Sequence, residues 1–391
     1  MLIKNLHGKN IVIWGTGREG NAAADFIRAQ LPDAAITFVD EASGGDIAGA
    51  LKAADIVVKS PGVSLYHPLL KGKNVTSLMN LWFAAPHAGK TICITGTKGK
   101  STTSFLLAHV LTHMGYKATA VGNIGVPISE APQDSDYIVI ETSSYQAANF
   151  DGECDIAAVT SLYPEHLDWH GDFETYARDK LHILGQAKTK IVHRQVAETV
   201  HVPRQSIICE DEGADIPNDY LSRPHNRANV AIVLKIVESL GLDQARALAA
   251  MADFKGLPHR QFELGEKDGI LYVDDSIATT PQAAMAAMDV YRRRPLTLIV
   301  GGHDRGVDYT TLAAYIKSHA IQAVIGLGAS GARILDQVPG QKAANMEEAV
   351  RLAKAATPAG GVILLSPAAP SFGLFKNYIE RGEAFARESG F

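Results

Sequence analysis

The most informative segment of this 391-residue chain is Thr91-Ile92-Cys93-Ile94-Thr95-Gly96-Thr97-Lys98-Gly99-Lys100-Ser101-Thr102. Its apolar start predicts a short buried strand, and residues 103–113 predict a helix directly after the loop. Glycines allow backbone N–H groups to face phosphate oxygens, the helix N-terminus favours an anion, and a lysine adds positive charge. The segment therefore predicts a phosphate-binding loop for ATP.

The loop is a shortened variant of the P-loop, because Ile94 stands where the full pattern has glycine. We expect Lys100 to contact the triphosphate and the Ser101 hydroxyl to bind a phosphate-bound Mg²⁺. The residues expected to bind ATP in this loop are Gly96, Thr97, Lys98, Gly99, Lys100, Ser101 and Thr102.

The composition is that of a soluble globular enzyme with two or three domains. Charged residues make up 20% and apolar residues 46% of the chain. The net charge of −5, without a long basic run, argues against nucleic acid and membrane surfaces as partners. Cys93, Cys154 and Cys209 lack metal-binding spacing, and the N-terminus does not resemble a signal peptide. We therefore expect buried or inert thiols and a cytoplasmic protein.

Strand and helix patterns divide the chain into three α/β segments, residues 1–89, 90–255 and 256–391. Apolar runs predict strands at 10–14, 36–39, 55–58, 91–94, 137–140, 156–160, 190–192, 270–273, 296–300, 323–325 and 362–365. A long helix is predicted over residues 226–240. Because helices alternate with strands, the sheets should be parallel. The prediction is an α/β protein with a Rossmann-like N-terminal domain, a central P-loop ATPase-type domain and a C-terminal Rossmann-like domain.

The turn after the first strand, residues 15–20, matches the pattern G-x-G-x-x-G, and Asp40 lies about 20 residues beyond it. Three interpretations stay open for this turn: an NAD site, a site for a nucleotide-sugar diphosphate, or a purely structural turn. The nucleotide sugar is favoured over NAD because no later motif indicates hydride chemistry.

Two further strand ends carry groups that could hold metal. Glu141 ends a strand expected beside the phosphate-loop strand, where a carboxylate could coordinate Mg²⁺; a solvated strand-end glutamate is the alternative. His166 lies in an acidic segment after another strand, and zinc is disfavoured there because no thiolate or Glu-x-x-His pattern completes a tetrahedral set. Lys180, by pattern alone, is a surface lysine on a helix.

These motifs recur in a fixed order along the chain. They are Thr95-Gly96-Thr97-x-Gly99-Lys100-Ser101, Gly122-Asn123-Ile124-Gly125, Glu141-x-Ser143-Ser144-x-Gln146, His166-x-Asp168, Lys180, Asn226-x-x-Asn229, Gly256-Leu257-Pro258-His259-Arg260, Asp275-Ser276-x-Ala278-Thr279 and Ser366-Pro367-Ala368. The series resembles the Mur ligase family over nearly the whole chain, and most of all its glutamate-adding branch.

The resemblance implies a role for each matching residue. Lys100, His166 and Lys180 would be catalytic, with Lys180 carbamylated. The metal ligands would be Ser101, Glu141, His166 and Lys180, holding two Mg²⁺. ATP would also be contacted by Asn226, Asn229, Arg260 and Asp275. The muramoyl-peptide channel would be lined by Asn123, Ser143 and Gln146, and the UDP end would be held by Gly15, Asp40, Ser60, Pro61 and Gly62.

The implied reaction is ATP-driven amide formation in peptidoglycan precursor synthesis, which serves cell-wall biogenesis, cell shape and division. A carboxylate of UDP-N-acetylmuramoyl-L-alanine would attack the γ-phosphorus, and the amino group of glutamate would displace phosphate from the resulting acyl-phosphate. D-glutamate is the family default, and a sister group adds L-glutamate. We expect a cytoplasmic monomer with no nucleic-acid or membrane partner.

The chain departs from the family pattern at three places. Lys98 replaces an asparagine, Ile277 replaces the lysine usual in D-glutamate ligases, and residues 303–305 replace an acid-glycine-lysine run. The candidate glutamate contacts that remain are Thr279, Arg305, Ser371 and Tyr378, and Arg305 can bind a carboxylate with two hydrogen bonds. The alternatives are another Mur or folylpolyglutamate-type ligase, and a non-catalytic nucleotide-binding module paired with an amidotransferase.

Overall fold

The computed structural model describes residues 3–41, 44–211 and 215–391. Its contacts divide the chain into two compact units, Met1–Phe254 and Lys255–Phe391. The strands and helices alternate as predicted, which confirms the α/β fold class, except at β11 (Phe262–Lys267) and β12 (Ile270–Asp274). These two strands are joined by a short turn and pair antiparallel, so the prediction that all the sheets are parallel is wrong there. The first unit contains two of the three predicted segments, so the division into three domains stays a prediction. Among the described residues, no helix is long and apolar enough to cross a membrane.

The first sheet of the N-terminal unit is parallel and has the strand order β2-β1-β3-β4. It is built from η1 (Ile3–Leu6), β1 (Asn10–Trp14), α1 (Arg18–Gln30), β2 (Ala35–Val39), α2 (Ile47–Ala53), β3 (Ile56–Lys59), η3 (Pro68–Leu70), β4 (Val75–Thr76) and α3 (Leu78–Phe83). The turns after β1 and β3 lie side by side at the carboxyl edge, where open α/β sheets bind ligands.

The second sheet is also parallel, with the order β10-β9-β8-β5-β7-β6. Its elements are β5 (Lys90–Thr95), α4 (Lys100–His113), β6 (Ala118–Gly122), η4 (Ile128–Glu130), β7 (Tyr137–Glu141), α5 (Ser144–Ala147), β8 (Cys154–Val159), α6 (Leu167–His170), α7 (Phe173–Gly185), β9 (Ala187–His193), α8 (Arg194–Thr199), β10 (Ile207–Cys209), α9 (Asp219–Ser222), α10 (Pro224–Ser239) and α11 (Gln244–Ala249). The central strand β5 leads into the phosphate loop, with the ends of β7 and β8 on either side of it.

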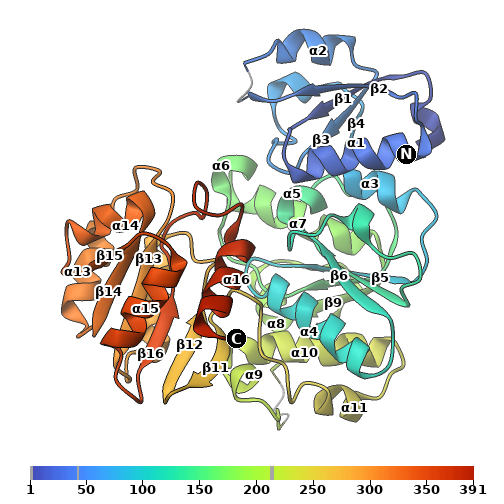
Figure 1. Cartoon of the computed structure of the whole chain (residues 1–391). Helices are drawn as coiled ribbons and strands as arrows, with labels where there is room; N and C mark the ends of the chain where they lie inside the picture. The colour runs from blue at the N-terminus through green and yellow to red at the C-terminus, as the bar shows by residue number, and fades with distance from the viewer. Residues whose placement is uncertain (1–2, 42–43, 212–214) are drawn as a thin grey trace. The chain divides into compact units, whose positions relative to one another are not determined.

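Two hydrophobic cores cover the two faces of this second sheet. On one face α4, α10 and α11 pack together, and Figure 1 shows α4 and α10 side by side. The other face shares a continuous core with α7, α1 and α3, so that Ile27 and Trp82 belong to the same cluster as Ile138. This shared core explains why the first two sheets form one compact unit, since apolar burial is the main stabilising term.

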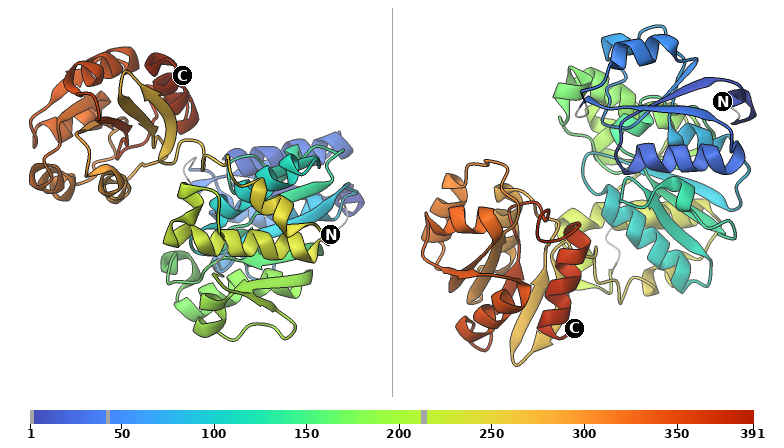
Figure 2. Two further views of the ribbon diagram at one scale, coloured as in Figure 1. Left: turned by 90° about the horizontal axis from the view of Figure 1, so that it is seen from below. Right: turned by 45° about the horizontal axis from the view of Figure 1, so that its top comes forward.

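The second unit, golden yellow to red in Figures 1 and 2, has the strand order β11-β12-β16-β13-β14-β15, with only β11 antiparallel. Its elements are β11 (Phe262–Lys267), β12 (Ile270–Asp274), α12 (Pro281–Tyr291), β13 (Leu296–Gly301), α13 (Thr310–Ser318), β14 (Ala323–Leu327), α14 (Gly328–Leu335), β15 (Gln341–Ala343), α15 (Met346–Ala356), β16 (Val362–Leu365) and α16 (Tyr378–Ser389). Helices α12 and α13 cover one face, and α15 and α16 cover the other.

Candidate active site

The phosphate loop is shaped by two glycines in conformations that other residues rarely adopt. Gly96 has φ 145° and Gly99 has φ 86°. A Cβ atom on Gly96 would lie 2.0 Å from Thr160 Oγ1, and one on Gly99 would lie 2.3 Å from Asn229 Oδ1. Gly99 is also the N-cap of α4, so the helix begins at Lys100, three residues earlier than predicted. The backbone N–H groups at this start are left to bind an anion.

Two lysines converge on one carbonyl of this loop. Lys100 Nζ donates to Gly96 O at 2.9 Å and to Thr97 O at 3.0 Å, and Lys180 Nζ also donates to Gly96 O at 2.9 Å. Lys180 is 2% exposed, so the surface position predicted from its helix pattern alone is wrong. Burial, with the positive charge of Lys100 nearby, holds the pKa of Lys180 well below its ordinary value.

Glu141 presents a buried carboxylate at the end of β7, beside the phosphate loop. Asn123 Nδ2 donates to Glu141 Oε1 at 2.7 Å, and Glu141 is 2% exposed. Its other oxygen, Oε2, is buried and has no hydrogen-bond partner among the described residues. An unsatisfied buried carboxylate oxygen is costly unless something binds it, and hard divalent cations bind such oxygens. The residues present therefore fit a Mg²⁺ ion at this strand end.

The segment after β8 approaches the phosphate loop from the other side. Lys98 Nζ lies 2.6 Å from Glu165 Oε1, so the extra charge in the loop is matched by a partly exposed carboxylate. His166 adopts a left-handed backbone conformation at the start of α6 and keeps a side chain that is 46% exposed. Partial burial lowers the pKa of the His166 imidazole, which favours the neutral form that can bind a metal.

Asn229 of α10 lies against the same loop, and Asn226 lies beside Asn229. Asn229 Nδ2 donates to Asn226 Oδ1 at 3.2 Å, and Asn229 Oδ1 accepts from Thr103 Oγ1 at 3.1 Å. Asn226 in turn donates to Tyr220 O. Both asparagines are buried, and the structure places Asn229 beside Gly99 of the phosphate loop, with Asn226 joined to it through Asn229.

The turn after β1 borders a cavity of about 380 Å³ at the carboxyl edge of the first sheet. This cavity is lined by four of the residues expected at the UDP end, Gly15, Asp40, Ser60 and Gly62. The fifth, Pro61, does not line it. Gly15 has φ 113°, and its Cα approaches Ser60 so closely that a Cβ would lie 2.4 Å from Ser60 Oγ. Asp40 Oδ2 accepts from the N–H and the hydroxyl of Thr16, at 2.9 Å each.

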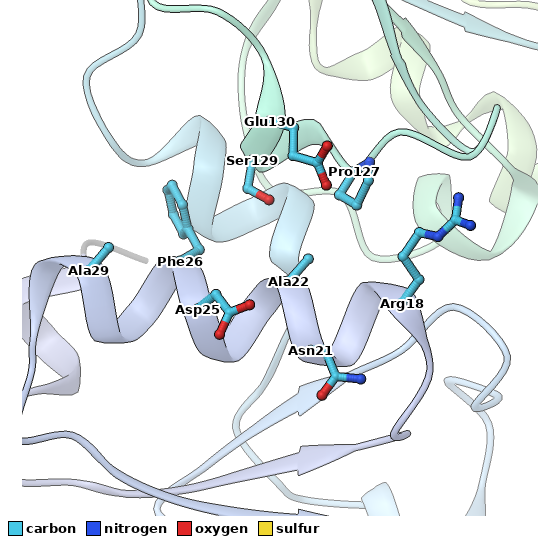
Figure 3. Close-up of a pocket in the computed structure, with 9 residues that line it drawn as sticks. All are labelled: Arg18, Asn21, Ala22, Asp25, Phe26, Ala29, Pro127, Ser129 and Glu130. Carbon is cyan, nitrogen blue, oxygen red and sulfur yellow. The ribbon is translucent and has the colours of Figure 1, made fainter.

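A second cavity, of about 460 Å³, lies between α1 and the segment around η4. Figure 3 shows Arg18 at one end of its α1 lining and Ala29 at the other, facing Pro127 and Ser129. None of the predicted site residues lines it, so we do not assign it to the active site. Arg18 donates to Gly125 O and thereby joins α1 to the turn that carries Asn123.

A largely buried polar group consists of Glu19, Lys59 and Gln146. Of the three, only Gln146 was identified from the sequence as a site residue. Gln146 Nε2 donates to Glu19 Oε1 at 2.6 Å, and Gln146 also completes the capping box with Ser143 at the start of α5. Burial lowers the pKa of Lys59 to about 8, with Glu19 acting in the opposite direction. Glu19 lay within the glycine pattern and Lys59 at a strand end, but only the fold brings Glu19 into contact with Gln146 and places Lys59 near Glu19.

In the second unit, the predicted residues lie after three neighbouring strands. Asp275 follows β12, and its carboxylate accepts from Ser366 Oγ at 2.6 Å and from Gln261 N at 3.1 Å. Burial raises the pKa of Asp275 to about 6, while the charge of Arg260 acts to lower it. Arg260 itself is exposed.

Three of the four predicted glutamate contacts lie in loops of this unit, and the fourth, Tyr378, is the first residue of α16. Arg305, after β13, is exposed and lies 6.0 Å from the ring of Phe372, which follows the buried Ser371. Thr279 is exposed, and Tyr378 accepts from Ser276 Oγ at 2.8 Å through its backbone carbonyl. The structure thus brings Arg305 near the Ser371 loop. Sequence reasoning missed Arg381, which is fully buried and donates to Ser276 O at 2.7 Å and Ala369 O at 2.9 Å.

Comparison with known protein families gives two matches. Residues 94–200 match the Mur ligase middle domain, and residues 259–369 match the Mur ligase glutamate ligase domain. The first range covers the phosphate loop, Glu141, His166 and Lys180. The second begins beside Arg260 and ends after Ser366.

Curated relatives match the chain along its whole length. It is 40% identical to the UDP-N-acetylmuramoyl-L-alanine--L-glutamate ligase of Xanthomonas axonopodis pv. citri, over 461 aligned positions that cover 100% of this chain and 97% of the relative. It is also 40% identical to the enzymes of the same name from a Micromonospora species, with 99% and 97% covered, and from Salinispora tropica, with 99% and 98% covered. Because 391 residues align over 461 positions, the first relative carries insertions that this chain lacks.

Solved structures share the fold at low sequence identity. The MurF ligase of Thermotoga maritima in complex with ADP gives a TM-score of 0.56 at 16% identity, covering 99% of this chain and 96% of that chain. The UDP-N-acetylmuramate-alanine ligase MurC of the same organism gives 0.58 at 18% identity, covering 97% and 98%.

Proposed function

The chain belongs to the Mur ligase family, and we propose that it is the ATP-dependent ligase that joins glutamate to UDP-N-acetylmuramoyl-L-alanine. The observation that carries the proposal is the 40% identity to glutamate ligases over the full length of the chain. The product is a precursor of peptidoglycan. We place the reaction in the cytoplasm and expect a monomer to perform it.

We propose L-glutamate as the amino acid, instead of the D-enantiomer that is the family default. The relatives at 40% identity are named for L-glutamate. The sequence itself departs from the D-glutamate pattern at Ile277, where a lysine is usual, and at residues 303–305. Both departures lie in the unit that carries Arg305 and Ser371, so they support a changed amino-acid pocket.

In the first step, we propose, the acceptor carboxylate attacks the γ-phosphorus of ATP, forming the acyl-phosphate and releasing ADP. The carboxylate and the triphosphate repel each other, and Lys100 is placed to offset this repulsion once it leaves the loop carbonyls for the phosphates. In the second step the amino group of glutamate attacks the acyl carbon, loses a proton and displaces phosphate. This step requires a neutral amine and the exclusion of water.

Glu141, Ser101, His166 and Lys180 would hold Mg²⁺, which supplies Lewis-acid stabilisation of phosphate charge when bound. The unpartnered Oε2 of Glu141 supports this ligand set. Lys180 would take part as a carbamate. Its lowered pKa favours the uncharged amine, which is the form that reacts with carbon dioxide, and carbamylation would turn this buried side chain into an anion suited to a metal.

The assay that tests the proposal is phosphate release from ATP with UDP-N-acetylmuramoyl-L-alanine and one glutamate enantiomer at a time. We expect release that requires both the acceptor and L-glutamate. Omission of the acceptor, or its replacement by a folate or by an acceptor that already carries glutamate, should reduce release to background. Equal release without the acceptor would contradict the proposal, and release with a folate would favour the folylpolyglutamate alternative.

A further inference from the structure

Three side chains that no part of the proposed reaction uses meet at the C-terminal end of α4. His109 and His113 are four residues apart and therefore share one face of the helix. Asp253, at the end of the first unit, lies against this face. One ligand atom from each of the three residues lies within 4.8 Å of the other two, the only such group among the described residues.

The hydrogen bonds around the two imidazoles determine which nitrogen atoms face Asp253. His113 Nδ1 lies 2.9 Å from His109 O, the carbonyl one turn earlier, and must donate a proton to it. This fixes the tautomer and leaves His113 Nε2 directed at Asp253 Oδ2, 3.4 Å away. Metal-bound histidines commonly have this arrangement, with one ring nitrogen donating to a carbonyl and the other free to bind the ion.

When both histidines are neutral, the nitrogen and oxygen atoms of the three side chains cannot all be paired. His109 Nε2 lies 3.1 Å from Asp253 Oδ1 and 3.0 Å from Ala250 O, so two oxygen atoms compete for a single proton. The lone pair of His113 Nε2 then faces a carboxylate oxygen with no proton between them. The two rings are 3.9 Å apart, so protonating both would place two positive charges in contact. A shared metal cation would accept the lone pairs of both Nε2 atoms and the charge of the Asp253 carboxylate at the same time.

We propose that His109, His113 and Asp253 form a binding site for a divalent transition-metal ion of the zinc class. Two imidazole nitrogens and a carboxylate suit zinc, cobalt or nickel better than Mg²⁺, which prefers oxygen ligands. His113 and Asp253 side chains are 43% and 66% exposed, so water would complete the coordination shell.

The site is separate from the proposed catalytic centre. His113 lies twelve residues beyond Ser101 on the same helix, about 18 Å along its axis at the usual rise of 1.5 Å per residue. A bound ion would fasten the segment 250–253, which follows α11, to the end of α4. The site would therefore brace the C-terminal end of the first unit, immediately before Lys255.

The test is zinc binding to the full chain, measured by competition with a chromogenic chelator in the presence of excess Mg²⁺. We expect the wild type to bind one equivalent of Zn²⁺ more than the double variant His109→Ala/His113→Ala. Asp253→Asn should weaken that equivalent at least ~10-fold, since it removes the charged ligand. His201→Ala, which removes an exposed histidine elsewhere, should bind as the wild type does.

A second measurement uses the wild type alone. Zn²⁺ should protect His109 and His113, but not His201, from modification by diethyl pyrocarbonate, located by peptide mass spectrometry. Equal zinc stoichiometry in the wild type and the double variant, or equal modification of these two histidines with and without Zn²⁺, would overturn the proposal.

Discussion

At the scale of single residues, the largest difference between pattern and structure is at Lys180. Its helix pattern predicts a solvent-exposed side chain, yet the ammonium is buried and donates to Gly96 O. The periodicity of apolar residues reflects only the neighbours of a residue along its own helix. Lys180 is buried against the phosphate loop, whose Gly96 lies 84 residues away in sequence. Family resemblance identified this residue where periodicity could not.

Lys180→Ala should lose most of its ligase activity, and short-chain carboxylates such as acetate or propionate should restore part of it. The removed side chain, as a carbamate, would supply an anionic group that a small carboxylate can replace. Lys188→Ala is the matched control, because that lysine is 60% exposed on β9. Phosphate release at normal bicarbonate is the measurement. Unchanged activity of Lys180→Ala would remove this residue from the mechanism.

Arg305→Ala should raise the KM for glutamate at least ~10-fold, the factor that corresponds to 1.4 kcal/mol. Glutamate carries two carboxylates, and an unpaired one in a closed site costs roughly 1–3 kcal/mol. The KM for ATP should change much less, since the proposed nucleotide contacts include Lys100, Asn226 and Asn229. Arg351→Ala, at a 66% exposed arginine of α15, is the control. Equal loss of affinity for both substrates would show that Arg305 has another role.

Asp275 should make the stability of the chain depend on pH between about 4 and 6. Burial raises its folded-state pKa from 3.8 to about 6, so the folded state holds a proton that the unfolded state releases. The resulting stability is present below pH 4 and lost as the pH rises through 6. The free energy of unfolding of the wild type, relative to Asp275→Asn, should therefore fall by up to roughly 3 kcal/mol across this range. Urea unfolding at several pH values measures it, and a constant difference would contradict the assignment.

At the scale of helices and strands, apolar runs predicted the central strands well because each is buried on both faces. The predicted strands at 10–14 and 362–365 agree residue for residue with β1 and β16. The short edge strands were not predicted from the sequence. β4 has two residues, and β10 and β15 have three each, which are too few to establish an apolar pattern. Strand β6, with the sequence Ala-Thr-Ala-Val-Gly, is too weakly apolar to be predicted as a strand.

The phosphate loop and α4 act as one element, and Gly99 sets where the helix starts. Gly99→Ala should weaken ATP binding and lower stability, because its Cβ would lie 2.3 Å from Asn229 Oδ1 at a φ of 86°. Gly185→Ala is the control, since a Cβ there meets nothing within 4 Å. Calorimetric titration with an ATP analogue and thermal unfolding measure the two effects. Binding as tight as in the Gly185→Ala variant would show that the loop tolerates a different helix start.

At the scale of the whole chain, sequence reasoning predicted the fold class, the family and the order of the sheets along the chain. It could not predict that the first two sheets share one hydrophobic core, because the contacts of Ile27 and Trp82 with the second sheet depend on packing between distant segments. The contact between Asp253 and α4 could not be predicted for the same reason. The four-residue spacing of His109 and His113 is read directly from the sequence, but Asp253 lies 140 residues beyond His113. Long-range pairs of this kind emerge only from the fold.

The central claim is that this chain joins L-glutamate to UDP-N-acetylmuramoyl-L-alanine. The most direct measurement supplies the acceptor and ATP with an equimolar mixture of D- and L-glutamate, isolates the UDP-linked product and determines the chirality of its glutamate after hydrolysis. We expect a product that has gained one glutamyl residue, almost entirely of the L form. A product carrying D-glutamate, or an acceptor recovered without glutamate after ATP has been consumed, would contradict it.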